Sequence, residues 1–155
     1  MTINLFYSYT HQDEALRDRL AIHLKLLQRQ QVIDSWHDRK IGAGREWEQA
    51  IDDNLEAADI ILLLISADFL ASDYCWDIEI KRGMQRYAEN SAVVIPVSLR
   101  ECDKTDAEFM KLQGLPKDFK PVTLWPNQDE AFTDIAKGIR SAAHKIRTEG
   151  IHNPK

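Results

Sequence analysis

The chain has 155 residues, with 20 basic and 25 acidic side chains, a net charge of −5, 44% hydrophobic residues and 29% charged residues. This composition predicts one globular domain, and the negative charge argues against a protein that mainly coats nucleic acid or an anionic membrane. The longest apolar run has six residues, too few to cross a bilayer, and the first residues lack a signal-peptide pattern. The two cysteines have neither metal nor redox spacing, which favours a cytoplasmic location.

The first half of the chain alternates apolar runs with stretches of helical periodicity. A strand is expected over residues 3–7 and a helix over residues 13–29, where leucines recur at helical spacing. Residues 32–36 predict a second strand. A polar loop over residues 37–44 follows, and residues 47–58 then present the single apolar face of an amphipathic helix.

The third apolar run is the most regular feature of the chain. Residues 60–65 are six consecutive aliphatic residues, the pattern of a strand buried on both faces of a parallel sheet. A third helix is expected over residues 74–89, and it contains Glu79. Ligands of open parallel sheets bind beyond the carboxyl ends of the strands, so Glu79 stands where chemistry is expected.

The second half of the chain completes the alternation. Residues 92–97 predict a fourth strand, in which Pro96 lacks an N–H and should interrupt the strand or make its end irregular. A short helix over residues 105–113 and a fifth strand over residues 122–124 follow. The last helix carries an apolar stripe that consists of Phe132, Ile135, Ile139, Ala143 and Ile146.

Two helix starts carry capping residues. Thr10 and Asp13 fit a capping box before the first helix, and Asn127 with Glu130 fits one before the last helix. The polar residues 149–155 are expected to form a flexible tail, which leaves residues 1–148 as the single domain.

Five strands alternating with helices predict an α/β fold, a three-layer sandwich with a parallel sheet covered by helices on both faces. Right-handed crossovers and a change of direction after the first strand give the flavodoxin-like strand order 2-1-3-4-5. This architecture hosts many functions, so the function must be argued from the site.

Several well-known sites of such sheets are missing from the sequence. Gly42 and Gly44 follow the second strand rather than the first, so neither a Rossmann fingerprint nor a phosphate-binding loop is present. Ser8 and Ser66 occupy strand ends where a phospho-acceptor receiver domain needs acidic residues. No histidine pair has ligand spacing and no G-x-S-x-G occurs, so neither a metal site nor an α/β-hydrolase is expected. A flavodoxin-like nucleotide-binding protein of unknown ligand stays a weaker alternative.

Three segments leave the carboxyl ends of neighbouring strands and can line one crevice, at residues 6–14, 36–47 and 66–79. Together they resemble the Toll/interleukin-1 receptor (TIR) domain family, especially its bacterial members, over residues 3–147. The matching boxes, in chain order, are residues 6–9, 38–44, 72–79 and the weak box 124–125.

The resemblance implies an enzyme, an NAD+ glycohydrolase (NADase) that releases nicotinamide and ADP-ribose or a cyclic ADP-ribose form, with NAD+ as substrate and no cofactor. Glu79 matches the catalytic glutamate of family members that cleave NAD+. The alternative interpretation is that Glu79 is an ordinary solvated glutamate on a helix. A carboxylate near the ribose can stabilise the positive charge that develops when the nicotinamide bond breaks. The substrate-binding candidates are Ser8, Tyr9, Thr10, Asp38, Arg39, Lys40 and Trp76.

Two departures from the family pattern concern this site. Many members place a tryptophan four residues before the glutamate, whereas this chain has Cys75 there, flanked by Tyr74 and Trp76. Some members carry arginines just after the first box, whereas this chain has Thr10 and His11.

The resemblance also implies activation by self-association, in bacterial immune or stress signalling that a sensor domain or partner protein triggers. The expected association loop comprises Trp36, His37, Ile41, Gly42, Ala43 and Gly44. The alternative is a non-enzymatic adaptor that acts through homotypic TIR contacts. An open crevice beside Glu79 would distinguish the enzyme from the adaptor, because a non-enzymatic scaffold would fill the crevice with side chains or turn Glu79 outward.

Overall fold

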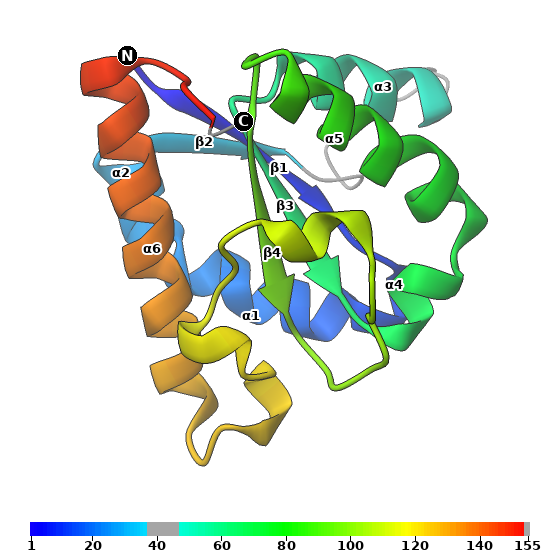
Figure 1. Cartoon of the computed structure of the whole chain (residues 1–155). Coiled ribbons are helices and arrows are strands. Elements are labelled where there is room, and N and C mark those ends of the chain that lie inside the picture. The colour runs from blue at the N-terminus through cyan, green and yellow to red at the C-terminus, as the bar shows by residue number, and fades with distance from the viewer. Residues whose placement is uncertain (37–46, 154–155) are drawn as a thin grey trace.

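The computed structural model describes residues 1–36 and 47–153, which form an α/β sandwich around a parallel sheet (Figure 1). The sheet order is β2-β1-β3-β4, which confirms the α/β class and the first four places of the expected order. The strands are β1 (Ile3–Ser8), β2 (Ile33–Trp36), β3 (Ile60–Ile65) and β4 (Val93–Ser98).

Strand β3 lies at the centre of the sheet. It pairs with β1 through Phe6 and Ile61 and with β4 through Leu62 and Ile95, both in parallel. All six of its side chains are fully buried, which confirms the expectation from its unbroken aliphatic run.

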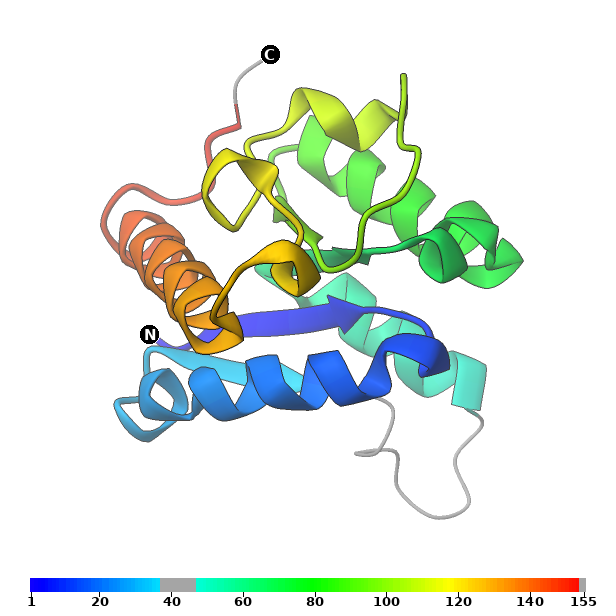
Figure 2. The same cartoon turned by 90° about the horizontal axis from the view of Figure 1, so that it is seen from below.

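Helices cover both faces of the sheet and give two separate hydrophobic cores. One core packs under α1, α2 and α6, and the other under α3, α4 and α5. The side-by-side packing of α1 and α6 is visible in Figures 1 and 2. Between these helices His23 stacks on Phe132, with ring centroids 5.4 Å apart. The helices are α1 (Glu14–His23), α2 (Lys25–Arg29), α3 (Trp47–Ala57), α4 (Ala67–Ala71), α5 (Lys81–Ala88) and α6 (Gln128–Glu149). No helix in the described part of the chain is long and apolar enough to span a membrane.

The expected fifth strand is wrong, and the described sheet has four strands. Val122–Leu124 forms a 3-10 turn, η6, directly after Pro121. The N–H of Leu124 donates to the carbonyl of Pro121, which closes the turn. The N–H of Thr123 donates to the carbonyl of Leu99, just after β4. Local β-propensity is therefore overridden by the turn, because strand propensity depends strongly on context.

The expected interruption at Pro96 is also wrong, since β4 runs continuously through it. The Pro96 carbonyl accepts a hydrogen bond of 2.9 Å from the N–H of Leu115, so this peptide faces the outer edge, away from β3. Proline is tolerated there because no neighbouring strand needs its missing donor. The N–H of Ser98 donates to the carbonyl of Leu115, which covers this end of the edge.

Helix boundaries agree in part with the expectations. The helix expected over residues 13–29 is divided at Leu24 into α1 and α2. The cap at Asn127 is confirmed, because its side chain accepts from the N–H groups of Asp129 and Glu130. The apolar stripe of α6 is buried as expected.

Two expectations for helical segments need correction, and a third is confirmed. Residues 105–113 contain only a 3-10 turn, η4 (Glu108–Lys111). The helix expected over residues 74–89 is present over residues 73–88, and it includes a π-helical turn, η3 (Cys75–Ile80), before α5. The side chain of Thr10 accepts no capping bond from a backbone N–H, and its hydroxyl donates to Oδ2 of Asp13 at 3.4 Å.

Candidate active site

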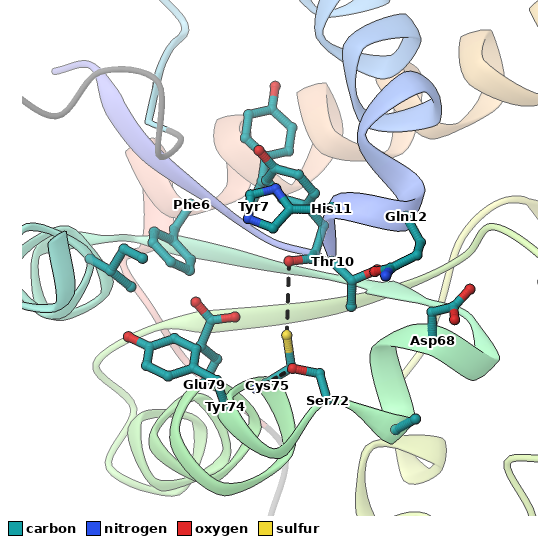
Figure 3. Close-up of a pocket in the computed structure, with 13 residues that line it drawn as sticks. Phe6, Tyr7, Thr10, His11, Gln12, Asp68, Ser72, Tyr74, Cys75 and Glu79 are labelled. Carbon is teal, nitrogen blue, oxygen red and sulfur yellow. Dashed lines mark hydrogen bonds between the residues drawn. The ribbon is translucent and has the colours of Figure 1, made fainter.

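A cavity of about 410 Å³ opens at the carboxyl edge of the sheet, between the end of β1 and the segment that follows β3 (Figure 3). Its volume falls in the usual range for small-molecule sites. The described residues that line it are Phe6, Tyr7, Tyr9, Thr10, His11, Gln12, Ile51, Asp68, Ala71, Ser72, Tyr74, Cys75 and Glu79. A second cavity of about 560 Å³ lies along β4, and none of its described lining residues is a carboxylate.

The carboxylate of Glu79 lies against this first cavity, with only 4% of the residue exposed. The hydroxyl of Ser8, at the end of β1, donates a hydrogen bond of 2.6 Å to its Oε1. Ser8 is itself fully buried and does not line the cavity. A buried carboxylate needs such donors to offset its loss of hydration, so the Ser8 hydroxyl helps to fix Glu79 in place.

Tyr74 is the aromatic residue of the segment around the π-helical turn that accompanies Glu79 at the cavity. Cys75, four residues before Glu79, lines the cavity as well. Such π-helical turns occur frequently at functional sites. Tyr74, five residues before Glu79, lines the cavity, whereas Trp76 is 44% exposed and does not line it. The structure therefore places Tyr74, rather than the predicted Trp76, beside the carboxylate.

Cys75 packs between Glu79 and the first box. Its Sγ lies 3.8 Å from the carbonyl oxygen of Tyr9, and the residue is 3% exposed. Burial raises the pKa of this thiol to about 12, and the charge of Glu79 adds to the effect. The thiol is neutral at physiological pH and is therefore no nucleophile.

Arg17 of α1 supports the opposite wall of the cavity. The residue is 2% exposed, and its guanidinium lies 5.6 Å from the ring centre of Tyr7 and 5.2 Å from that of Tyr9. These cation–π contacts hold two cavity-lining rings in place. Burial raises the pKa of Tyr7 to about 12, so its phenol stays neutral.

Asp13 joins three strand ends at the far side of the cavity. Its buried carboxylate accepts a short hydrogen bond from the hydroxyl of Ser66 and one of 2.7 Å from Nε of Arg100. Nη2 of Arg100 also contacts Asp68, at 2.5 Å from Oδ2. These bonds replace the expected capping box, because Asp13 connects the segments after β1, β3 and β4 instead of capping a helix.

The predicted site residues are only partly brought together. Glu79, Tyr9 and Thr10 line the cavity, Ser8 lies behind Glu79, and Trp76 does not line the cavity. The backbone of Trp36 ends β2. The remaining predicted residues lie outside the described part of the chain, and they are His37, Asp38, Arg39, Lys40, Ile41, Gly42, Ala43 and Gly44.

The sequence analysis placed the segment of Asp68 and Tyr74 at the crevice without selecting either as a site residue, and it missed Arg100 altogether. Asp68 and Arg100 follow the carboxyl ends of β3 and β4, so their place beyond strand ends was the available signal. Among residues 1–36 and 47–153, no three histidine, cysteine or acidic side chains are grouped so that they could hold a metal ion.

Comparisons with known proteins agree with this architecture. The family model of the TIR domain matches residues 5–137. The protein y4lF of Sinorhizobium fredii (strain NBRC 101917 / NGR234) is 54% identical over 143 residues, which cover 92% of this chain and 44% of y4lF. The chain thus spans less than half the length of that relative.

One solved structure shares the fold. The crystal structure of the TIR domain of the Toll-related receptor TRR-2 from Hydra magnipapillata has a TM-score of 0.63 and 17% identity, and the match covers 88% of this chain and 95% of that one. A prokaryotic SEFIR domain has a TM-score of 0.49 and 20% identity, with 99% and 98% covered. Since the family model spans most of the chain, from β1 into α6, the chain belongs to the TIR domain family.

Proposed function

We propose that this TIR domain is an NAD+ glycohydrolase that releases nicotinamide and leaves ADP-ribose or a cyclic form. The observation that carries the proposal is the Glu79 carboxylate, which is almost wholly buried, bonded to Ser8 and part of the lining of an open cavity. A scaffold without activity has no need of a buried carboxylate beside an open cavity, so this geometry favours an enzyme over an adaptor.

The chemistry requires one well-placed carboxylate. When the C–N bond between ribose and nicotinamide breaks, its electron pair leaves with nicotinamide and positive charge develops on the ribose. The carboxylate of Glu79 stabilises that charge, and the low dielectric of its surroundings strengthens the interaction. Addition of water, with loss of one proton, then gives ADP-ribose, while attack by the adenine ring of the same molecule gives a cyclic product.

The remaining cavity walls suit an aromatic leaving group. Phe6, Tyr9 and Tyr74 line the cavity together with Glu79. Such rings pack on a flat heterocycle with little loss of side-chain entropy and exclude water from the reacting bond.

Self-association belongs to the proposal as well. TIR domains interact with other TIR domains, and we extend this to activation through residues 36–44, in cytoplasmic immune or stress signalling that a sensor triggers. Head-to-tail contacts of this kind generate rings or open filaments.

The test is nicotinamide release from NAD+ by the purified domain at high concentration with a crowding agent. Glu79→Gln should lower the rate by at least about 100-fold, the usual loss when a preorganised electrostatic contact is removed. Asp77→Asn is the matched control, because it removes an exposed carboxylate from the same π-turn. Equal inactivity of the wild type and Glu79→Gln under assembling conditions would refute the enzyme and favour the adaptor.

A further inference from the structure

The described part of the cavity lining offers no positive side chain to an anionic substrate. Its described charged lining residues are Asp68 and Glu79, with His11 as a titratable group, and no lysine or arginine is among them. NAD+ carries two phosphates, which need donors or cations to offset their loss of water. This inference rests on the proposed function and concerns where those phosphates bind.

Two described cations contact residues that line the cavity. Arg17 is 2% exposed and packs on the rings of Tyr7 and Tyr9, so it is covered by the wall. The side chain of Arg100 is 35% exposed, and its Nη2 lies 2.5 Å from Oδ2 of Asp68. In Figure 3, Asp68 lies on the right of the view, and Glu79 lies on the left, near Phe6 and Tyr74. A ligand whose ribose lies at Glu79 can therefore extend toward Asp68 and Arg100.

The two carboxylate partners of Arg100 differ in how easily they can be displaced. The side chain of Asp13 is fully buried and bonds Nε of Arg100 at 2.7 Å, whereas that of Asp68 is 45% exposed. Separating Arg100 from Asp13 would leave a buried charge unpaired, which is costly. Releasing Asp68 only returns its carboxylate to water, and such exposed ion pairs contribute little.

We propose that Arg100 is the phosphate subsite of this cavity. Asp13 holds the guanidinium through Nε, and Nη2 exchanges Asp68 for a phosphate oxygen of the dinucleotide. Arginine suits this role because its planar guanidinium remains charged and presents several donors in fixed directions. Asp68 is then an internal competitor that lowers the affinity for the substrate.

The test is calorimetric binding of ADP-ribose, which keeps both phosphates, and of adenosine, which has none. Asp68→Asn should tighten ADP-ribose binding by up to about five-fold, the range of an exposed ion pair, and leave adenosine binding unchanged. Arg100→Gln should weaken ADP-ribose binding by roughly ten-fold. Asp73→Asn is the control, because it removes one exposed acidic charge from the same segment without a bond to Arg100.

Asp68→Asn decides the outcome, since it leaves the buried pair of Arg100 and Asp13 intact. Unchanged or weaker ADP-ribose binding in this variant would overturn the proposal, and weaker binding would mean that Asp68 itself contacts the ligand. Failure of every variant and the wild type to bind ADP-ribose would overturn it as well. Binding needs no turnover, so this result is independent of nicotinamide release, which tests the proposed function.

Discussion

Replacing Ser8 by alanine removes the hydroxyl that donates to Glu79 across 2.6 Å. Both residues are buried, at 0% and 4% exposure, so water cannot readily take the place of the lost donor. A hydrogen bond to a charged group contributes roughly 1.5–3 kcal/mol to folding. We therefore expect the free energy of unfolding of Ser8→Ala to fall by about 2 kcal/mol, and its Tm by roughly 4–8 °C for a domain of this size.

Ser98→Ala is the matched control for this change. Ser98 ends β4 as Ser8 ends β1, it is also fully buried, and its hydroxyl has no hydrogen-bond partner within the described residues. Its loss should leave the stability within about 0.5 kcal/mol of wild type, because no bond is broken.

Urea denaturation followed by tryptophan fluorescence measures both variants, and nicotinamide release gives the second readout. If Ser8 positions Glu79, Ser8→Ala lowers kcat more than it raises KM, while Ser98→Ala changes neither. Equal urea midpoints for the two variants would refute the reasoning, since the Ser8 hydroxyl would then contribute nothing to holding Glu79.

Two further predictions concern buried groups. Arg86→Met should lower the free energy of unfolding by about 3–5 kcal/mol in thermal or urea denaturation. Arg82→Met, at a half-buried arginine whose ion pair with Glu56 lies at the surface, should change it by no more than about 1 kcal/mol. Similar losses in the two variants would contradict this reasoning. The guanidinium of Arg86 donates to three backbone carbonyls that would lose their donor, those of Leu55, Ala58 and Ser91. Because the pKa of Cys75 is raised from 9.0 to about 12 in the folded protein, the stability that its neutral thiol provides is full below pH 9 and is lost as pH rises toward 12. The free energy of unfolding, measured in urea from pH 8 to 10.5, should therefore fall less steeply with pH in Cys75→Ala than in wild type. The two slopes should differ by at most about 1.4 kcal/mol per pH unit. Identical slopes would exclude this effect.

The fold was largely accessible from the sequence, because its strongest signals are periodic. The aliphatic run of β3 and the apolar stripe of α6 each specify burial through spacing alone. The segment at Val122–Leu124 has the composition of a strand, yet Pro121 and the turn hydrogen bonds give it another structure. Short segments of this kind depend on tertiary context, so the strand count could not be predicted.

The site was accessible only in part. The position of Glu79 follows from the family motif and from the rule that sites lie beyond strand ends. Its aromatic neighbour could not be read from a four-residue spacing, because that position holds Cys75, and the structure brings Tyr74 to the cavity while Trp76 is exposed. Which of the two flanking aromatic residues faces the cavity depends on how this helical segment packs, and that has no reliable local sequence signal.

The sequence by itself determined the layered architecture, the buried central strand and Glu79 as the carboxylate to test, since hydrophobic spacing and a motif are local properties of the chain. Only the tertiary structure decided that Ser8 donates to Glu79 and that Arg100 bridges Asp13 and Asp68. These pairs are separated by 71, 87 and 32 residues along the chain. Contacts over such separations form when the strand ends meet at one edge of the sheet, and no local pattern encodes them.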